Sequence, residues 1–338
     1  MISQSTLNQL SRRKWLRDAA LTATGVVVLL SFLTGCNDHV EPGGTRQTRF
    51  IPVGNSLKVE VLDWGGKGKA LLLLTGLGNT AHVFQDFAPR FTDQFHVYAM
   101  TRRGFGQSSH PATGYDVTTL ARDILIVINS LQIDKVILVG HSIGGEEISK
   151  FASSYPNRVE KVVYLDAALD RIGWPAIQKQ SPPAPEPTAN DLSSPENSYK
   201  FSVEVSNLKF PYEEFLQQYV FSPDGRYLRQ VAPEFVEDSI LNGLEHPAYG
   251  RIQCPALAIY ARHLSVKGLI PYYDRLDASD KKKADAYFGV IQAYYEQEVN
   301  RFKTQVAQGQ AKLINGAHHY VFLSHPTETV SMIRDFLR

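Results

Sequence analysis

Short apolar runs rich in β-branched residues alternate with helix-like patterns from Phe50 to the C-terminus, and this alternation constrains the fold more than any other feature. The predicted strands cover 48–53, 57–64, 69–74, 95–101, 135–139, 161–165, 256–261 and 311–315. Helical patterns lie at about 82–91, 116–131, 144–155 and 326–337. The alternation predicts a mostly parallel sheet with helices on both faces. Gly54-Asn55-Ser56 separates the first two strands and predicts a hairpin, so the sheet should begin antiparallel.

Two stretches interrupt this alternation. Residues at about 171–250 include a Pro-rich run and many Tyr and Phe residues, a stretch too long for a loop and too interrupted for a separate core. We expect them to form an inserted cap over the edge of the sheet. Residues at about 279–308 form a long helical pattern with apolar side chains at Tyr287, Phe288, Ile291, Tyr294, Tyr295 and Val299. Such a stripe is expected to pack against the core rather than to line a ligand site.

The predicted strand 135–139 runs directly into Gly140-His141-Ser142-Ile143-Gly144, and a helical pattern begins at once. This is the motif G-x-S-x-G between a strand and a helix, where a serine nucleophile stands on a strained turn. The two glycines remove side chains that would collide with neighbouring backbone. Ser142 would also lie at a helix N-terminus, whose free N–H groups favour developing negative charge. The motif therefore predicts Ser142 as a nucleophile.

With this motif the sequence resembles the α/β-hydrolase superfamily, over about residues 48–170 and 250–338. The resemblance implies an eight-stranded, mostly parallel sheet flanked by helices, with an inserted helical cap. Residues 71–79, Leu-Leu-Leu-Leu-Thr-Gly-Leu-Gly-Asn, are similar to the family's third strand and oxyanion loop. By position, the resemblance implies that the backbone N–H groups of Leu77 and Ile143 form the oxyanion hole. Thr75 stands where many members have histidine, a change that leaves the backbone donor intact.

The histidine that the resemblance implies follows the last predicted strand, in Gly316-Ala317-His318-His319-Tyr320. The family's catalytic histidine lies three residues after that glycine, which selects His319 and leaves His318 as the weaker alternative. His141 lies inside the serine motif, where its side chain should flank the serine and pack.

The position of the catalytic acid is open. Many family members carry it just after the seventh strand, yet here no carboxylate follows that strand until Asp274. The sixth strand ends in Asp166, which matches the place of the acid in some lipases of the superfamily. Asp166 would accept the Nδ1–H of His319 and set its tautomer. Asp274 and Glu146 are the alternatives, and the adjacent Glu147 is expected to be solvated.

The resemblance implies a serine hydrolase that cleaves a carboxylic ester or a related acyl compound through an acyl-enzyme on Ser142. His319 would be the base and Asp166 the acid, with no metal or organic cofactor. The aromatic cap and the uncharged interior suggest a small, neutral and apolar substrate. Perhydrolases, carbon–carbon hydrolases and acyltransferases of this fold keep the serine and stay open. A non-catalytic, ligand-binding envelope lipoprotein on the same scaffold is the alternative from another class.

Composition excludes several other classes. The chain carries 35 Lys and Arg against 34 Asp and Glu, a balance that argues against a nucleic-acid binder. Its only cysteines are Cys36 and Cys254, too few for a disulfide framework or a cysteine metal site.

The N-terminus indicates export. Residues 11–17, Ser-Arg-Arg-Lys-Trp-Leu-Arg, resemble a twin-arginine signal and precede an apolar run of about 15 residues, shorter than the roughly 20 of a bilayer-spanning helix. The run ends in Leu33-Thr34-Gly35-Cys36, which resembles the lipobox of bacterial lipoproteins. We therefore expect a signal peptide at 1–35, a lipid anchor on Cys36, a tether at 36–47, a hydrolase domain at 48–338 and a location in the cell envelope. An uncleaved N-terminal anchor is the alternative.

Overall fold

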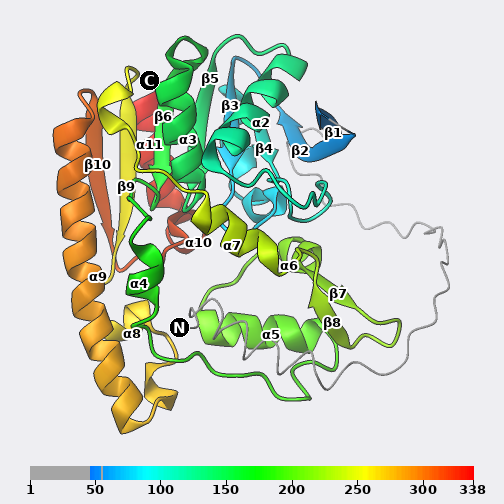
Figure 1. Cartoon of the computed structure of the whole chain (residues 1–338), viewed down its shortest axis with the longest axis vertical. Coiled ribbons are helices and arrows are strands. Elements are labelled where there is room, and N and C mark those ends of the chain that lie inside the picture. Colours follow the sequence, from blue (N-terminus) through cyan, green and yellow to red (C-terminus); the bar gives the residue numbers. More distant parts are fainter. Residues whose placement is uncertain (1–45, 55) are drawn as a thin grey trace.

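The computed structural model describes residues 46–54 and 56–338, and its centre is one sheet in the order β1-β2-β4-β3-β5-β6-β9-β10 (Figure 1). The strands are β1 Gln47–Gly54, β2 Leu57–Gly65, β3 Lys69–Leu74, β4 Phe95–Met100, β5 Val136–His141, β6 Val159–Leu165, β9 Ala256–Arg262 and β10 Gly309–Asn315. β2 runs antiparallel to both β1 and β4, whereas the other neighbours are parallel. The mostly parallel sheet of eight strands and its antiparallel start confirm the prediction from the sequence.

Helices cover both faces of the sheet because its central strands bury apolar side chains on both sides. On one face lie α2 Val117–Ser130, α3 Gly144–Ser154 and α9 Ala278–Gln305. On the other face lie η1 Ala81–Phe84, η2 Ala88–Phe91, α10 Val321–Ser324 and α11 Pro326–Leu337. The shorter helices are η3 Pro156–Arg158, η4 Tyr249–Arg251, α8 Val266–Leu269 and η5 Tyr273–Arg275. None of the helices in residues 46–54 and 56–338 is both long and apolar enough to cross a membrane.

The helix predicted at about 82–91 is wrong, because this segment forms two short 3₁₀ helices, η1 and η2. Pro89 lies in the first turn of η2 and has no N–H to donate to the carbonyl four residues earlier. A continuous α-helix would lose that hydrogen bond and crowd the same carbonyl. The apolar pattern that suggested a helix arises because Val83, Phe84, Phe87 and Phe91 are buried in the core.

The segment between β6 and β9 leaves the sheet and forms an inserted cap, which lies below the sheet in Figure 1. The cap contains α4 Trp174–Gln178, α5 Pro195–Ser206, α6 Tyr212–Gln218, β7 Tyr219–Phe221, β8 Tyr227–Gln230 and α7 Phe235–Asn242. The sequence predicts a helical cap, and the β7–β8 hairpin is an addition to it. Gly225 permits this hairpin because it adopts a φ of 87° in the connecting turn.

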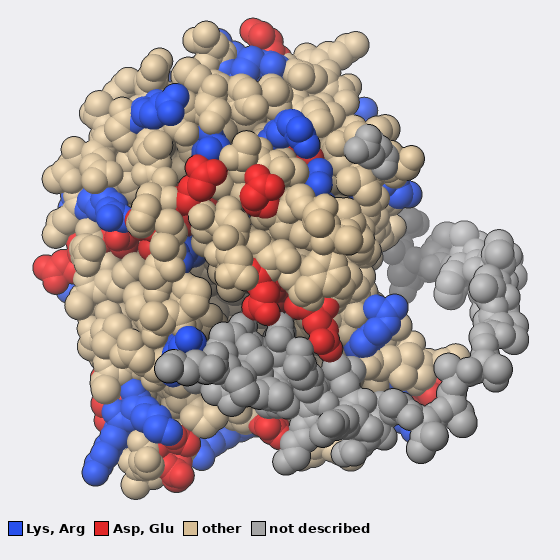
Figure 2. Space-filling view, in the orientation of Figure 1, with Lys and Arg blue, Asp and Glu red and all other residues tan. Residues whose placement is uncertain are grey.

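Surface charge is mixed on the face that Figure 2 shows, where Lys and Arg side chains lie scattered among Asp and Glu. This mixture agrees with the near-equal totals of 35 basic and 34 acidic residues in the sequence. Neither observation indicates a polyanionic partner.

Gly145 lets α3 approach the end of β6 closely. A Cβ atom at this position would stand 2.1 Å from the carbonyl oxygen of Ala167 and 2.8 Å from its Cβ. Both atoms belong to Ala167, which follows Asp166 just after the end of β6. The absence of a side chain at 145 therefore sets the distance between α3 and that segment.

We predict that Gly145→Ala lowers the free energy of unfolding by about 2 kcal/mol or more, because the new methyl group meets backbone that cannot move aside easily. Gly289→Ala is the matched control, since Gly289 lies inside α9 with nothing within 4 Å of the added Cβ. That control should gain about 0.5–1 kcal/mol through helix propensity. Urea denaturation followed by circular dichroism measures both, and equal stabilisation by the two changes would contradict the packing argument.

Candidate active site

Ser142 stands on the turn between β5 and α3. Its φ is 52°, in the left-handed region that a non-glycine residue seldom adopts. The Ser142 N–H donates to the Leu165 carbonyl at 3.3 Å, and the Gly145 N–H donates to the Ser142 carbonyl at 2.9 Å. A Cβ at Gly140 would lie 2.7 Å from the Gly144 carbonyl oxygen. The sharp turn thus has the hydrogen bonds and the glycine that hold a serine in this conformation.

Asp166 follows β6 in the same way that Ser142 follows β5. The register pairs His141 with Leu165, so the next residues, Ser142 and Asp166, leave the sheet at the same edge. Asp166 also has a positive φ, 49°, and is fully buried. Its N–H donates to the Ile259 carbonyl at 2.7 Å, and its Oδ1 accepts the Ala261 N–H at 2.9 Å. Neighbouring β9 therefore fixes both the backbone and one carboxylate oxygen of Asp166.

His319 follows β10 and reaches Asp166 from the other side. Its Nδ1 lies 2.6 Å from Asp166 Oδ2, and its side chain remains one-third exposed. Gly316 turns the chain at a φ of 74° and donates its N–H to the Arg262 carbonyl at 2.8 Å. Because an ionised carboxylate only accepts hydrogen bonds, the contact assigns the proton to Nδ1 and leaves Nε2 free as a base.

The alternative residues lie elsewhere. Asp274 is exposed and pairs with Lys267 at 2.8 Å. Glu146 is buried and accepts the Arg171 N–H at 3.2 Å, and burial raises its pKa to about 8. His318 accepts the Tyr320 N–H at 3.2 Å through Nδ1 rather than contacting a carboxylate, and burial lowers its pKa to about 4.

His141 is fully buried, in ring contact with His319, Tyr320 and Phe322. Its Nε2 lies 3.3 Å from the His319 carbonyl. The packing role expected for His141 agrees with this environment.

Glu147 is not solvated, contrary to expectation. Its side chain is 2% exposed and forms an ion pair with the Nε of Arg102, which is equally buried. Arg102 also donates to the carbonyls of Thr75 at 2.8 Å and Gly76 at 3.2 Å. The sequence alone could not reveal this contact, because the contact joins three segments that are distant in the sequence. The buried pair holds the segment that leads into Leu77.

Leu77, Ser142, Ile143 and His319 line one cavity of about 330 Å³. Among the described residues, the N–H groups of Leu77 and Ile143 donate no hydrogen bond to protein. Both residues thus line the cavity and have backbone N–H groups without a protein acceptor, as the implied oxyanion hole requires. The other lining residues are Leu169, Arg171, Trp174, Gln178, Leu241, His263, Leu269, Tyr287, Ile291, Tyr295 and Tyr320.

His263 directly follows β9, the strand after which the resemblance noted above would place the acid, and lines the same cavity. It is 8% exposed, and burial lowers its pKa, which favours the neutral ring. Nothing in the described part of the chain groups three or more His, Cys, Asp or Glu side chains as a metal site would need. Cys254 is a free thiol whose pKa burial raises to about 11, so it is not a reactive thiolate at neutral pH. Cys36 lies outside the described residues.

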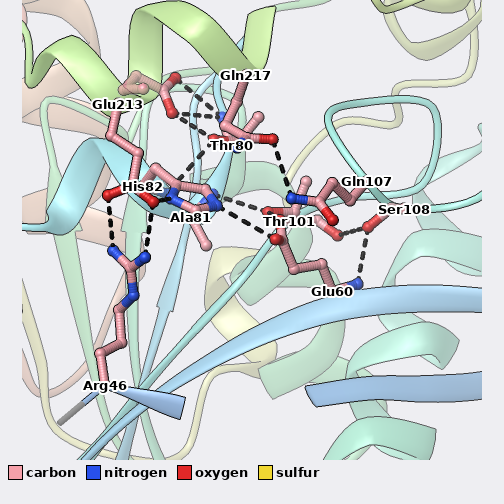
Figure 3. A network of polar contacts seen from close by, with 11 residues as sticks. Arg46, Glu60, Thr80, Ala81, His82, Thr101, Gln107, Ser108, Glu213 and Gln217 are labelled. Carbon is pink, nitrogen blue, oxygen red and sulfur yellow. Dashed lines mark hydrogen bonds and ion pairs between the residues drawn. The ribbon is translucent and has the colours of Figure 1, made fainter. Parts of the chain in front are cut away.

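The cap docks onto the segment after Leu77 through polar side chains of α6. In Figure 3, Glu213 lies between Arg46 and His82, with Arg46 Nη2 at 2.7 Å and His82 Nδ1 at 2.8 Å. On its other side, His82 Nε2 lies 3.2 Å from Glu60 Oε1, and Glu60 Oε2 accepts the Thr101 hydroxyl at 2.7 Å. The network therefore ties the residue before β1 to β2, η1 and α6.

Glu214, beside Glu213, is fully buried in the same interface. Its carboxylate accepts the Asn79 side-chain amide at 3.0 Å, the Thr80 N–H at 3.0 Å and the Gln218 amide at 2.6 Å. Asn79 in turn accepts the Tyr320 hydroxyl at 2.9 Å. Burial outweighs these donors and raises the pKa of Glu214 to about 7. The contacts join the cap to the residues that flank Leu77 and His319.

We predict that Glu214 makes stability depend on pH. Between its ordinary pKa of 4.5 and about 7, the folded chain holds a proton that the unfolded chain has released, so the free energy of unfolding falls as pH rises. Glu214→Gln should reduce this fall by up to about 3 kcal/mol, measured by urea denaturation at about pH 5 and about pH 8.

Glu213→Gln is the matched control for that measurement. The hydrogen bond from Arg46 lowers the pKa of Glu213, so its contribution is lost only below its ordinary pKa of 4.5. In the control, the free energy of unfolding should differ between the two pH values by nearly as much as it does in the wild type. An unchanged difference in Glu214→Gln would contradict the prediction.

Residues 69–236 match the family model described as alpha/beta hydrolase fold. The 2-(acetamidomethylene)succinate hydrolase of Mesorhizobium japonicum is 37% identical over 101 residues, which cover 30% of this chain and 36% of that protein. The 2-hydroxy-6-oxononadienedioate/2-hydroxy-6-oxononatrienedioate hydrolase of Burkholderia vietnamiensis is 29% identical over 246 residues, which cover 66% of this chain and 81% of that protein. The first curated relatives are matched over only 30% to 36% of their own length.

A crystal structure of E-2-(acetamidomethylene)succinate hydrolase has a TM-score of 0.62 and 23% sequence identity. The match covers 87% of this chain and 99% of that one. At this identity the likeness concerns the fold. Together with the family model and the sheet order, it shows that this chain has the α/β-hydrolase fold.

Proposed function

We propose that this chain is a serine hydrolase that cleaves a carboxylic ester or a related acyl compound through an acyl-enzyme on Ser142. The observation that carries the proposal is the 2.6 Å contact between His319 Nδ1 and Asp166 Oδ2, beside the cavity that Ser142 lines. A histidine oriented by a buried carboxylate can take a proton at Nε2 and return it later. The strained turn at Ser142 presents a hydroxyl in the same cavity.

In the proposed reaction, His319 Nε2 takes the proton of Ser142 while the serine Oγ bonds to the substrate carbonyl carbon. The carbonyl oxygen becomes an oxyanion and accepts the N–H groups of Leu77 and Ile143. The intermediate then expels the alcohol, which takes the proton from His319. A water molecule deprotonated by His319 attacks the acyl-enzyme, and the acid and the free serine are released.

The substrate that we propose is small and largely apolar. Apolar side chains dominate the cavity wall, including Leu169, Trp174, Leu241, Leu269 and Ile291. Arg171 is the charged exception, and it pairs with the buried Glu146 at 3.8 Å. The two relatives compared above are named for succinate and dienedioate compounds, so a substrate panel should include acyl groups with and without a terminal carboxylate.

The first prediction of this proposal concerns the serine. A fluorophosphonate should add one label to the full chain by intact mass, because it bonds to activated serines. Ser142→Ala should abolish labelling, and His319→Gln should slow it by about a thousandfold or more. Ser149→Ala is the matched control, because Ser149 lies further along α3 and donates to the Gly145 carbonyl.

Unlabelled wild-type protein with a cooperative thermal transition would overturn the hydrolase proposal. It would favour the non-catalytic, ligand-binding lipoprotein. Labelling with no turnover across the ester panel would instead point to the perhydrolase, carbon–carbon hydrolase or acyltransferase reactions, which keep the activated serine.

A second part of the proposal concerns location. The twin-arginine pattern at 11–17 and the sequence Leu33-Thr34-Gly35-Cys36 support export, removal of 1–35 and acylation of Cys36. The mature protein would then be held at a membrane of the cell envelope by its lipid and tether.

We predict that Cys36→Ala abolishes lipid attachment and moves the protein from the detergent-rich phase to the aqueous phase in detergent partitioning. Cys254→Ala should leave partitioning unchanged, because Cys254 lies just before β9 and far from the signal in sequence. Retention of Cys36→Ala in the membrane fraction, with residues 1–35 still attached by mass, would support the uncleaved anchor instead.

A further inference from the structure

Tyr295 contacts the proposed catalytic acid from α9. Its hydroxyl donates to Asp166 Oδ2 at 2.7 Å, the same oxygen that lies 2.6 Å from His319 Nδ1. Burial raises the pKa of Tyr295 well above its ordinary value of 10.0, so the hydroxyl is a neutral donor at physiological pH. Tyr295 also lines the cavity that contains Ser142.

The hydroxyl completes the set of protein donors around a carboxylate that is shielded from bulk solvent. Asp166 is fully buried, so each of its oxygens needs protein donors. Oδ1 accepts the Ala261 N–H, while Oδ2 accepts both the Tyr295 hydroxyl and the His319 ring. Three donors from β9, α9 and the loop after β10 therefore restrain the orientation of the carboxylate.

We propose that Tyr295 is a positioning residue of the catalytic relay, which sets the orientation of Asp166 and limits how strongly its Oδ2 attracts the proton of His319. This inference rests on the proposed function, because it assigns the relay Ser142–His319–Asp166 to acyl transfer. Tyr295 belongs to the stripe of residues on α9 that is expected only to pack against the core. At this position the side chain also donates a hydrogen bond to Asp166.

The hydroxyl has two effects that a variant can separate. It shares the negative charge of Oδ2, so its removal strengthens the pull on the His319 proton. It also restricts rotation of the carboxylate, so its removal lets Oδ2 move away from His319 Nδ1. The first effect moves the acid limb of a pH–rate profile to higher pH, and the second lowers the rate on the plateau.

Other titratable groups face the same carboxylate from several elements. The Nη2 of Arg171 donates to the Asp166 carbonyl at 3.1 Å. Tyr260 of β9, His263 after β9 and His318 after β10 also lie within electrostatic reach. Tyr295→Phe leaves all of these groups in place, so a change in the profile belongs to the hydroxyl.

The neighbouring tyrosine provides a matched control. Tyr294 lies on the same helix, is half-buried like Tyr295, and donates its hydroxyl to the Asp170 carbonyl at 2.8 Å. Tyr294→Phe therefore removes the same atom, and a hydrogen bond to a backbone carbonyl, without touching Asp166. Any loss shared by both variants reports helix packing rather than positioning.

The test measures the rate of fluorophosphonate labelling of the full chain against pH for the wild type, Tyr295→Phe and Tyr294→Phe. We expect Tyr295→Phe to lower the plateau by about ten- to a hundredfold, the loss of a hydrogen bond to a charged group. Its acid limb should move to higher pH by about half a unit or more. Tyr294→Phe should match the wild type in both respects.

A double-mutant comparison sharpens the result. In Asp166→Asn the charged acceptor is already lost, so adding Tyr295→Phe should change the rate less than it does in the wild type. Equal losses in both backgrounds, or a Tyr295→Phe profile that superimposes on the wild type, would overturn the inference. Because the wild type must label first, an unlabelled wild type overturns the proposed function itself, and the two failures are distinguishable.

Incorporation of 3-fluorotyrosine at position 295 keeps the inference falsifiable if Tyr295→Phe does not fold. Fluorine makes the hydroxyl a stronger donor, so the acid limb should move to lower pH, opposite to Tyr295→Phe. An unmoved limb in a folded, labelled protein would count against the inference.

Discussion

The structure depends on the parallel pairing of β5 with β6. The register that places His141 beside Leu165 carries Ser142 and Asp166 out of the sheet at one edge, each with a positive φ. Two non-glycine residues in this conformation each cost free energy, and the cost persists only where surrounding hydrogen bonds fix the backbone. Here the Ser142 N–H bonds to Leu165 and the Asp166 N–H bonds to Ile259, so adjacent strands hold both turns.

The rest of the chain acts on this edge through long-range contacts. The Arg102–Glu147 pair holds the segment before Leu77, and Glu214 of the cap holds the segment after it. Helix α9 contributes Tyr295 to the carboxylate of Asp166. Each of these groups is buried or half-buried and has a specific partner, which restricts the positions available to the groups around the cavity. The cavity is therefore shaped by elements on every side of the sheet edge.

The sequence predicts best what depends on local patterns. The alternation of apolar runs with helical patterns predicts the eight strands of the sheet. The motif around Ser142 predicts the sharp turn that the structure contains. The sequence favours Asp166 as the acid but leaves Asp274 and Glu146 open as alternatives, because the choice depends on which loop returns to His319. The continuous helix predicted at 82–91 is wrong for a local reason. Pro89 interrupts it, and the spacing of apolar residues does not show this effect. The sequence could not predict the contacts of Glu147 and Tyr295, because their partners lie on other elements, far away in the sequence.

The most direct test of this account is the rate at which p-nitrophenyl acetate acylates the full chain and its Asp166→Asn, Asp274→Asn and Glu146→Gln variants. If Asp166 is the acid that orients His319, Asp166→Asn should lose about a thousandfold or more in acylation rate, because the wrong tautomer of histidine results. The Asp274→Asn and Glu146→Gln proteins should stay within about tenfold of the wild type, since neither side chain contacts His319. A folded Asp166→Asn protein that acylates as fast as the wild type would contradict the account.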